Sequence, residues 1–223
     1  MIKIYKYGEV SNSEIFARDN IDAGVEDIVA DIIYNVRKNG DRALFEYAEK
    51  FDKVTLSSLE VTKEEIDRAF ESVEPEFIEI VKEAKENITA FHKKQLRDGF
   101  EIREENGAIK GQKITPIEKV GLYVPGGTAA YPSTVLMDSI PAKIAGCDEI
   151  VMVTPPSKTG EVNPAILAAA KIAGVDRIFK VGGAQAVAAL AYGTESIPAV
   201  DKIVGPGNAF VAEAKSRFLA RFQ

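Results

Sequence analysis

Residues 119–127 read KVGLYVPGG, a short run of β-forming residues that ends in proline and two glycines. The same design recurs three times downstream: EIVMVTP begins at Glu149, RIFKVGG at Arg177 and KIVGPGN at Lys202. These starts lie 30, 28 and 25 residues apart, close to the ~30 residues of one βαβ unit. Because runs such as IVMV are apolar on both faces, they predict a parallel sheet that helices cover on both sides.

The segments between these runs have the composition of helices. We expect helices at 133–145, 164–173 and 184–192, and a further helix that begins near Asn208. Short strands that alternate with helices predict an α/β fold, a doubly wound parallel sheet of four strands, over residues 116–223.

Residues 1–115 have a different composition. They carry a net charge of −7 against +1 for residues 116–223, and they hold 6 of the 17 glycines and 1 of the 10 prolines. A change of this size marks a change of architecture. We therefore divide the chain into a helical N-terminal region, 1–115, and an α/β domain, 116–223.

Apolar residues at helical spacing support this reading of the first region. The pattern from Val25 to Val36 predicts a helix that ends before Gly40, and a second helix follows it. Thr62 and Glu65 have the spacing of a capping box at the start of another helix.

A further helix is expected to open at Pro75, and a hairpin to follow it. Asn106-Gly107 supplies the hairpin's turn within residues 97–115. The helix is expected to bury one stripe, made of Phe77, Ile80, Val81, Ala84, Ile88 and Phe91.

The whole-chain composition excludes several classes of protein. A net charge of −6 and a pI near 5.1 argue against a nucleic-acid partner, which needs a basic face. The single cysteine, Cys147, cannot form an internal disulfide and suits a reducing compartment. No apolar run reaches the ~18–20 residues of a membrane span and no signal segment is visible. We therefore expect a cytoplasmic protein without a membrane partner.

Three glycine-rich loops are expected at one edge of the sheet, where strands lead into helices and α/β proteins bind ligands. These loops place Tyr123, Gln185 and Asn208 at this edge. Glycine lets a backbone approach a ligand closely, and the helix start that follows offers N–H groups to a phosphate. Glycines also occur at such turns for backbone reasons alone. Since neither G-x-G-x-x-G nor a P-loop is present, the residues predict a ligand-binding α/β domain and no specific ligand.

At these loops the chain resembles the histidinol dehydrogenase family. The matching segments are 120–127 (VGLYVPGG), 133–137 (STVLM), 141–147 (PAKIAGC), 181–186 (VGGAQA), 191–195 (AYGTE) and 200–211 (VDKIVGPGNAFV), with 40–44 (GDRAL) and 47–52 (YAEKFD) upstream.

The resemblance implies an NAD-dependent, zinc-containing homodimer that oxidises L-histidinol through histidinal to L-histidine. It also implies an aldehyde dehydrogenase-like fold of incomplete Rossmann type. In the family, NAD contacts fall on the residues that match Tyr123, Gln185 and Asn208. NAD and L-histidinol are then the expected ligands, and a homo-oligomer, a dimer, is the expected assembly.

The chain also departs from the family. Family chains are about twice as long, and their zinc ligands and catalytic Glu-His pair lie beyond Gln223; the single histidine, His92, matches none of them. We therefore expect a truncated enzyme with neither catalytic residues nor metal ligands of its own, inactive alone. A frameshift near Lys215 is our hypothesis for the divergent tail, 216–223. The alternative is a non-catalytic remnant that self-associates or binds a nucleotide.

Overall fold

The computed structural model of this protein describes residues 4–16, 24–126 and 130–219. Four parallel strands form its main sheet in the order β5-β4-β3-β6. All four begin at the residues that the sequence predicts. The strands are β3 (Lys119–Tyr123), β4 (Glu149–Thr154), β5 (Arg177–Lys180) and β6 (Lys202–Val204).

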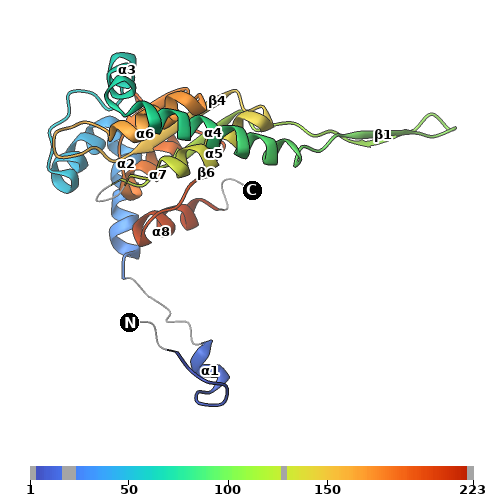
Figure 1. Ribbon diagram of the computed structural model, residues 1–223, viewed down its shortest axis with the longest axis horizontal. Coiled ribbons are helices and arrows are strands. Elements are labelled where there is room, and N and C mark those ends of the chain that lie inside the picture. Colours follow the sequence, from blue (N-terminus) through green and yellow to red (C-terminus); the bar gives the residue numbers. More distant parts are fainter. Residues whose placement is uncertain (1–3, 17–23, 127–129, 220–223) are drawn as a thin grey trace.

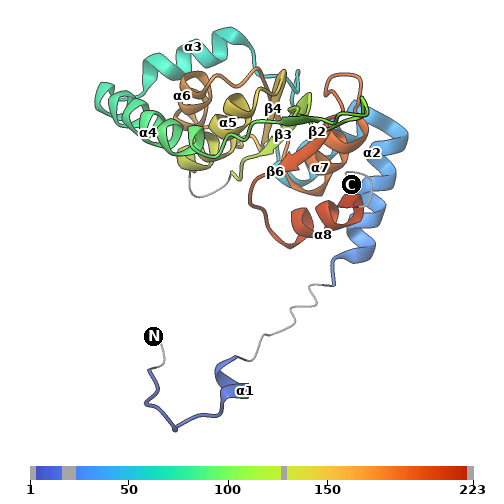
Figure 2. The ribbon, with the colours of Figure 1, turned by 90° about the vertical axis from the view of Figure 1, so that its right-hand side faces the viewer.

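Helices cover both faces of this sheet, which confirms the doubly wound α/β fold (Figure 2). Alternate strand residues face two separate cores: Val151 and Val153 pack with α2, α7 and α8, whereas Ile150 and Met152 pack with the other helices. The first face carries α2 (Glu26–Tyr47), α7 (Gly183–Tyr192) and α8 (Ala209–Phe218). The second carries α3 (Lys63–Ser72), α4 (Pro75–Lys93), α5 (Pro132–Ala145) and α6 (Pro164–Ala173).

Gly40 interrupts the helical path, as the sequence predicts, because two helical segments meet at a kink there. Helix α2 runs on to Tyr47 with a kink at Gly40, whose backbone adopts φ +52° and ψ −135°. The Glu195 carboxylate accepts a hydrogen bond from the N–H of Asp41 at 2.7 Å, just after the kink. Glycine suits this position because L side chains rarely adopt a positive φ, and a Cβ there would also lie 2.2 Å from that carboxylate. The π-helix η1 (Ala48–Asp52) then continues the chain.

The two sequence-predicted helix starts are confirmed. The Thr62 side chain accepts from the N–H of Glu65, and the Glu65 carboxylate accepts from the N–H of Thr62, which completes the capping box. Pro75 opens α4.

The expected apolar stripe of α4 is wrong in part. Ile78 and Val81 are buried, whereas Ile80 and Phe91 are 57% and 64% exposed. Phe77, Ala84 and Ile88 are partly buried against the core as expected. The buried line is rotated because α5 and α6, which α4 contacts, set the face that it presents.

Residues 59–61 cover the outer edge of β5. The N–H of Val61 donates to the carbonyl of Ile178 at 2.9 Å, and the N–H of Lys180 donates to the carbonyl of Leu59 at 2.7 Å. This pairing satisfies backbone groups that an edge strand otherwise leaves open.

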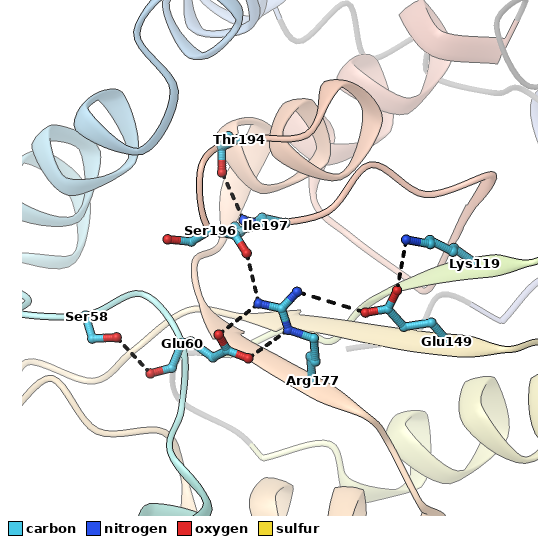
Figure 3. A network of polar contacts seen from close by, with 8 residues as sticks. All are labelled: Ser58, Glu60, Lys119, Glu149, Arg177, Thr194, Ser196 and Ile197. Atoms are coloured by element: carbon cyan, nitrogen blue, oxygen red, sulfur yellow. Dashed lines mark hydrogen bonds and ion pairs between the residues drawn. The ribbon is translucent and has the colours of Figure 1, made fainter.

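Arg177 fastens the same segment to the sheet (Figure 3). Its guanidinium makes two hydrogen bonds to the Glu60 carboxylate, at 2.8 and 2.9 Å, and a third to the carbonyl of Ser196 at 3.0 Å. Glu149 lies 4.0 Å from the guanidinium and pairs with Lys119 at 3.1 Å. The N-terminal region is thus tied to strands β3, β4 and β5 by charge as well as by packing.

A hairpin extends from the body of the molecule (Figure 1). Strands β1 (Phe100–Arg103) and β2 (Ile109–Gln112) pair antiparallel, and every residue in them is exposed. Asn106 and Gly107 form its turn, as predicted: the Asn106 side chain accepts from the N–H of Ala108. A short helix, α1 (Asn12–Ile15), contains no buried residue.

In the described ranges, no helix is long and apolar enough to cross a membrane.

Candidate functional site

A cavity of about 890 Å³ opens at the carboxyl ends of the parallel strands, within the range of about 300–1,000 Å³ that is usual for small-molecule sites. All three residues selected from the sequence line it, together with side chains from α2 and η1. The lining residues are Ile28, Ile32, Lys50, Phe51, Asp52, Tyr123, Pro125, Gly126, Tyr131, Pro155, Gly182, Gly183, Ala184, Gln185, Pro206, Gly207, Asn208 and Phe210. Gly127, which belongs to the first loop, lies outside the described residues.

Tyr123 ends β3 and connects two of the loops. It is 5% exposed, and its hydroxyl accepts a hydrogen bond from the N–H of Gly183 at 3.0 Å. Burial raises the pKa of the Tyr123 hydroxyl, and the charge of Asp52 raises it further, against the opposing effect of the Gly183 hydrogen bond. The phenol therefore stays neutral at physiological pH and holds the start of α7 against β3.

The N-terminus of α7 lines the cavity. Gly182 is the N-cap residue, and no side chain caps this helix. The first-turn N–H groups have no partner within a helix and favour an anion, although that of Gly183 is used by the Tyr123 hydroxyl. Gln185 is 4% exposed and lies over this turn, so a Cβ at Gly183 (φ +68°) would be 2.6 Å from its side-chain oxygen.

Asn208 has a structural role as well as a place in the cavity. Its side-chain oxygen accepts from the N–H of Val211 at 3.2 Å and caps α8. The loop before it passes close to β3: Gly205 has φ +110°, and a Cβ there would lie 2.1 Å from the carbonyl oxygen of Tyr123. Lys215 donates a hydrogen bond to the carbonyl of Gly205 and holds the loop from the other side.

The sequence reasoning missed the wall that the N-terminal region contributes. Lys50, Phe51 and Asp52 of η1 line the cavity with Ile28 and Ile32 of α2. Ile28 belongs to the apolar pattern of residues 25–36, yet its side chain is 50% exposed. Its helical periodicity could not show that this stripe ends at a cavity.

Asp52 is the acidic side chain in this wall. Burial raises its pKa to about 6. Within the described part of the chain, no hydrogen bond or ion pair to this carboxyl is found. A carboxyl group so placed is an acceptor without a protein donor.

No group of three or more histidine, cysteine, aspartate or glutamate side chains in the described ranges is placed to hold a metal ion. Cys147 is buried in the turn before β4, and burial raises the pKa of its thiol. The residues at the cavity suit a ligand that has apolar rings, hydroxyls and an anionic group.

The sequence matches the family model described as histidinol dehydrogenase over residues 17–222. The chain is 61% identical over 184 residues to a histidinol dehydrogenase from Clostridium acetobutylicum, covering 82% of this chain and 43% of that protein. It is 59% identical over 196 residues to one from Lactiplantibacillus plantarum, covering 88% of this chain and 46% of that protein. The chain thus spans a little less than half the length of these curated relatives.

The fold comparison agrees with the sequence comparison. The crystal structure of histidinol dehydrogenase from Elizabethkingia anophelis superposes with a TM-score of 0.83 at 40% sequence identity, covering 90% of this chain and 45% of that chain. Since the matches cover most of this sequence, both the fold and the loops around the cavity are included in them. The chain belongs to the histidinol dehydrogenase family.

Proposed function

We propose that this chain forms the NAD-binding part of a histidinol dehydrogenase, an oxidoreductase that converts L-histidinol to L-histidine with two NAD. The observation that carries the proposal is the cavity that brings Tyr123, Gln185 and Asn208 together at the carboxyl edge of the sheet. The family match supplies the reaction.

The groups around the cavity fit a dinucleotide. The uncapped start of α7 suits a pyrophosphate, because its N–H groups and helix dipole favour negative charge. The apolar side chains of Ile28, Ile32 and Phe210 suit a planar base. The Asn208 oxygen is used in capping α8, so its amide NH₂ is the part that remains for the ligand. When bound, NAD accepts the hydride.

Zinc does not fit the described residues in the same way, because they offer no cluster of ligands. The sequence also contains one histidine, His92, on the far end of α4 from Pro75. We therefore propose that any zinc ligands and proton-transfer residues come from a part of the protein that this chain does not include. The purified chain mixed with NAD and L-histidinol should produce no NADH; a measurable rate of absorbance increase at the NADH band would contradict this.

NAD binding is tested by calorimetry on the 223-residue chain. We expect saturable binding, weakened about tenfold in Asn208→Ser, since serine still caps α8 but lacks the amide donor. Asn163→Ser is the matched control: Asn163 caps α6 in the same manner but does not line the cavity. Absence of binding, or equal weakening by the two substitutions, would contradict the site.

The alternative of a non-catalytic remnant is not favoured, since the family model and the relatives above are histidinol dehydrogenases. We also propose that the chain forms a dimer in solution, measurable by light scattering. Its support is the exposed apolar side chains of the hairpin: Phe100 and Ile102 on one face and Ile109 on the other are each more than half exposed.

A further inference from the structure

Asp52 reaches the cavity through an irregular stretch of backbone. It is the last residue of η1, and Lys53 after it adopts the left-handed conformation with φ +60°. This turn ends the helix where its final carboxyl group lines the cavity, close enough to Tyr123 for the charge of Asp52 to influence the Tyr123 pKa. The cavity therefore has a positive helix end on one side and a carboxyl group on another.

The Asp52 carboxyl is half-buried and has no protein donor among the described residues. Burial alone raises its pKa to about 6, and in the described ranges no donor compensates it. At neutral pH it is ionised and needs hydrogen-bond donors. A ligand with neighbouring hydroxyl groups would supply two donors to one carboxylate, whereas a phosphate would bring a like charge.

A dinucleotide contains both kinds of group. Its pyrophosphate suits the N-terminus of α7. Its ribose hydroxyls are then the hydrogen-bond donors that can reach the Asp52 carboxylate. NADP differs from NAD by a phosphate on the 2′-hydroxyl of the adenosine ribose. A carboxylate beside this ribose is the ordinary physical means by which a site accepts the diol and rejects the phosphate.

We propose that Asp52 accepts hydrogen bonds from the adenosine ribose hydroxyls of the dinucleotide and makes this site select NAD over NADP. The proposal rests on the proposed function, since it assigns a role within the same cavity. It adds a specificity-determining residue from the N-terminal region, and it explains why an acidic side chain without a partner lines a site for an anionic ligand.

The test compares NAD and NADP by calorimetric titration of the purified chain at pH 7.5. For the native chain, NAD should bind about 100-fold more tightly than NADP, because like charges in a confined site repel strongly. Asp52→Asn keeps the size of the side chain and removes its charge. It should weaken NAD binding about tenfold, strengthen NADP binding, and bring the two affinities within about threefold of each other.

Glu49→Gln is the matched control. Glu49 is an exposed acid of the same η1 segment that does not line the cavity, so this variant should keep the native preference. Asp52→Ser, which is also neutral, should reproduce the loss of preference, and circular dichroism of each variant verifies the fold. If Asp52→Asn weakens the binding of NAD and NADP equally, or leaves the preference for NAD unchanged, the role of Asp52 is overturned. The proposal that the chain binds NAD is not affected by either result. If the native chain binds neither nucleotide, the proposed function and this inference both fail.

Discussion

Asp138 and Lys215 face each other behind the loop that carries Asn208. Burial raises the pKa of Asp138 to about 6, despite the opposing charge of Lys215, and burial lowers the pKa of Lys215. Within the described residues, Asp138 Oδ2 is buried without a hydrogen-bond partner. Lys215 instead donates to the carbonyl of Gly205. Lys215 therefore positions the loop, while the Asp138 carboxyl lacks a hydrogen-bond donor for one of its oxygens.

Replacing Asp138 by Asn should stabilise the chain at neutral pH. The folded pKa lies above the unfolded value of 3.8, so the folded state prefers the protonated acid. The stability that this preference contributes is complete below about pH 4 and is lost as the pH rises through about 6. Chemical denaturation at pH 7.5 should show a gain of at most about 3 kcal/mol for Asp138→Asn.

The same experiment at pH 4 provides the control, because native and variant side chains are then both neutral in the folded state. The difference between their free energies of unfolding should shrink toward zero there. A gain that does not change between pH 4 and 7.5 would show that the effect comes from packing and not from the charge of Asp138.

The sequence predicts a cavity residue only where a strand or a helix start positions it. Tyr123, Gln185 and Asn208 directly follow strands or begin helices, and the carboxyl ends of parallel strands must share one edge. Asp52 comes from a helical segment that no strand positions. Its place depends on the π-helix and on the left-handed Lys53, and neither has a local signal in the sequence.

At the scale of elements, Glu65 has two functions at the start of α3. It completes the capping box with Thr62, and its carboxylate pairs with Lys180 of β5, which is 8% exposed. Burial would raise the pKa of Glu65, but hydrogen bonds from Lys180 and the Thr62 backbone outweigh it and hold the pKa below its ordinary value. The stability from this pair is lost as the pH falls through that lowered pKa.

The two functions can be separated by mutation. Thr62→Ala removes the cap and should cost about 1 kcal/mol of unfolding free energy. Glu65→Gln retains a capping-box residue but leaves Lys180 without its charge partner, and should cost about 2 kcal/mol. Urea denaturation of both variants measures the two losses of unfolding free energy. A smaller loss for Glu65→Gln than for Thr62→Ala would show that the ion pair with Lys180 contributes little.

The regular elements were predictable where the sequence pattern itself determines the structure. The strands from Lys119 to Lys202 begin as predicted because four apolar runs and their glycine ends mark them. The break at Gly40 was predictable, but its support was not, since the carboxylate that contacts the kink belongs to Glu195. The predicted buried stripe of α4 is partly wrong for a similar reason. The helix has two adjacent rows of apolar residues, and its contacts with α5 and α6 determine which row is buried.

At the scale of the whole molecule, the N-terminal region contributes to both cores. Helix α2 packs with α7 and α8 on one face of the sheet, and α3 and α4 pack with α5 and α6 on the other (Figure 2). The division of the chain at residue 115 stays a prediction from composition. What the packing adds is that the helices covering both faces of the sheet in 116–223 are themselves covered by helices that precede them in the chain.

The contact between α2 and α8 has a consequence for synthesis on the ribosome. Arg217 donates a hydrogen bond to the carbonyl of Glu26 at 2.9 Å, although 191 positions separate them. During translation, α2 leaves the exit tunnel long before α8 and has no α8 to pack on until the segment between them has emerged. Contacts this distant along the chain slow folding, and the nascent helix exposes its apolar side meanwhile. Until α8 has emerged, the face of α2 that it covers in the folded chain stays without this partner.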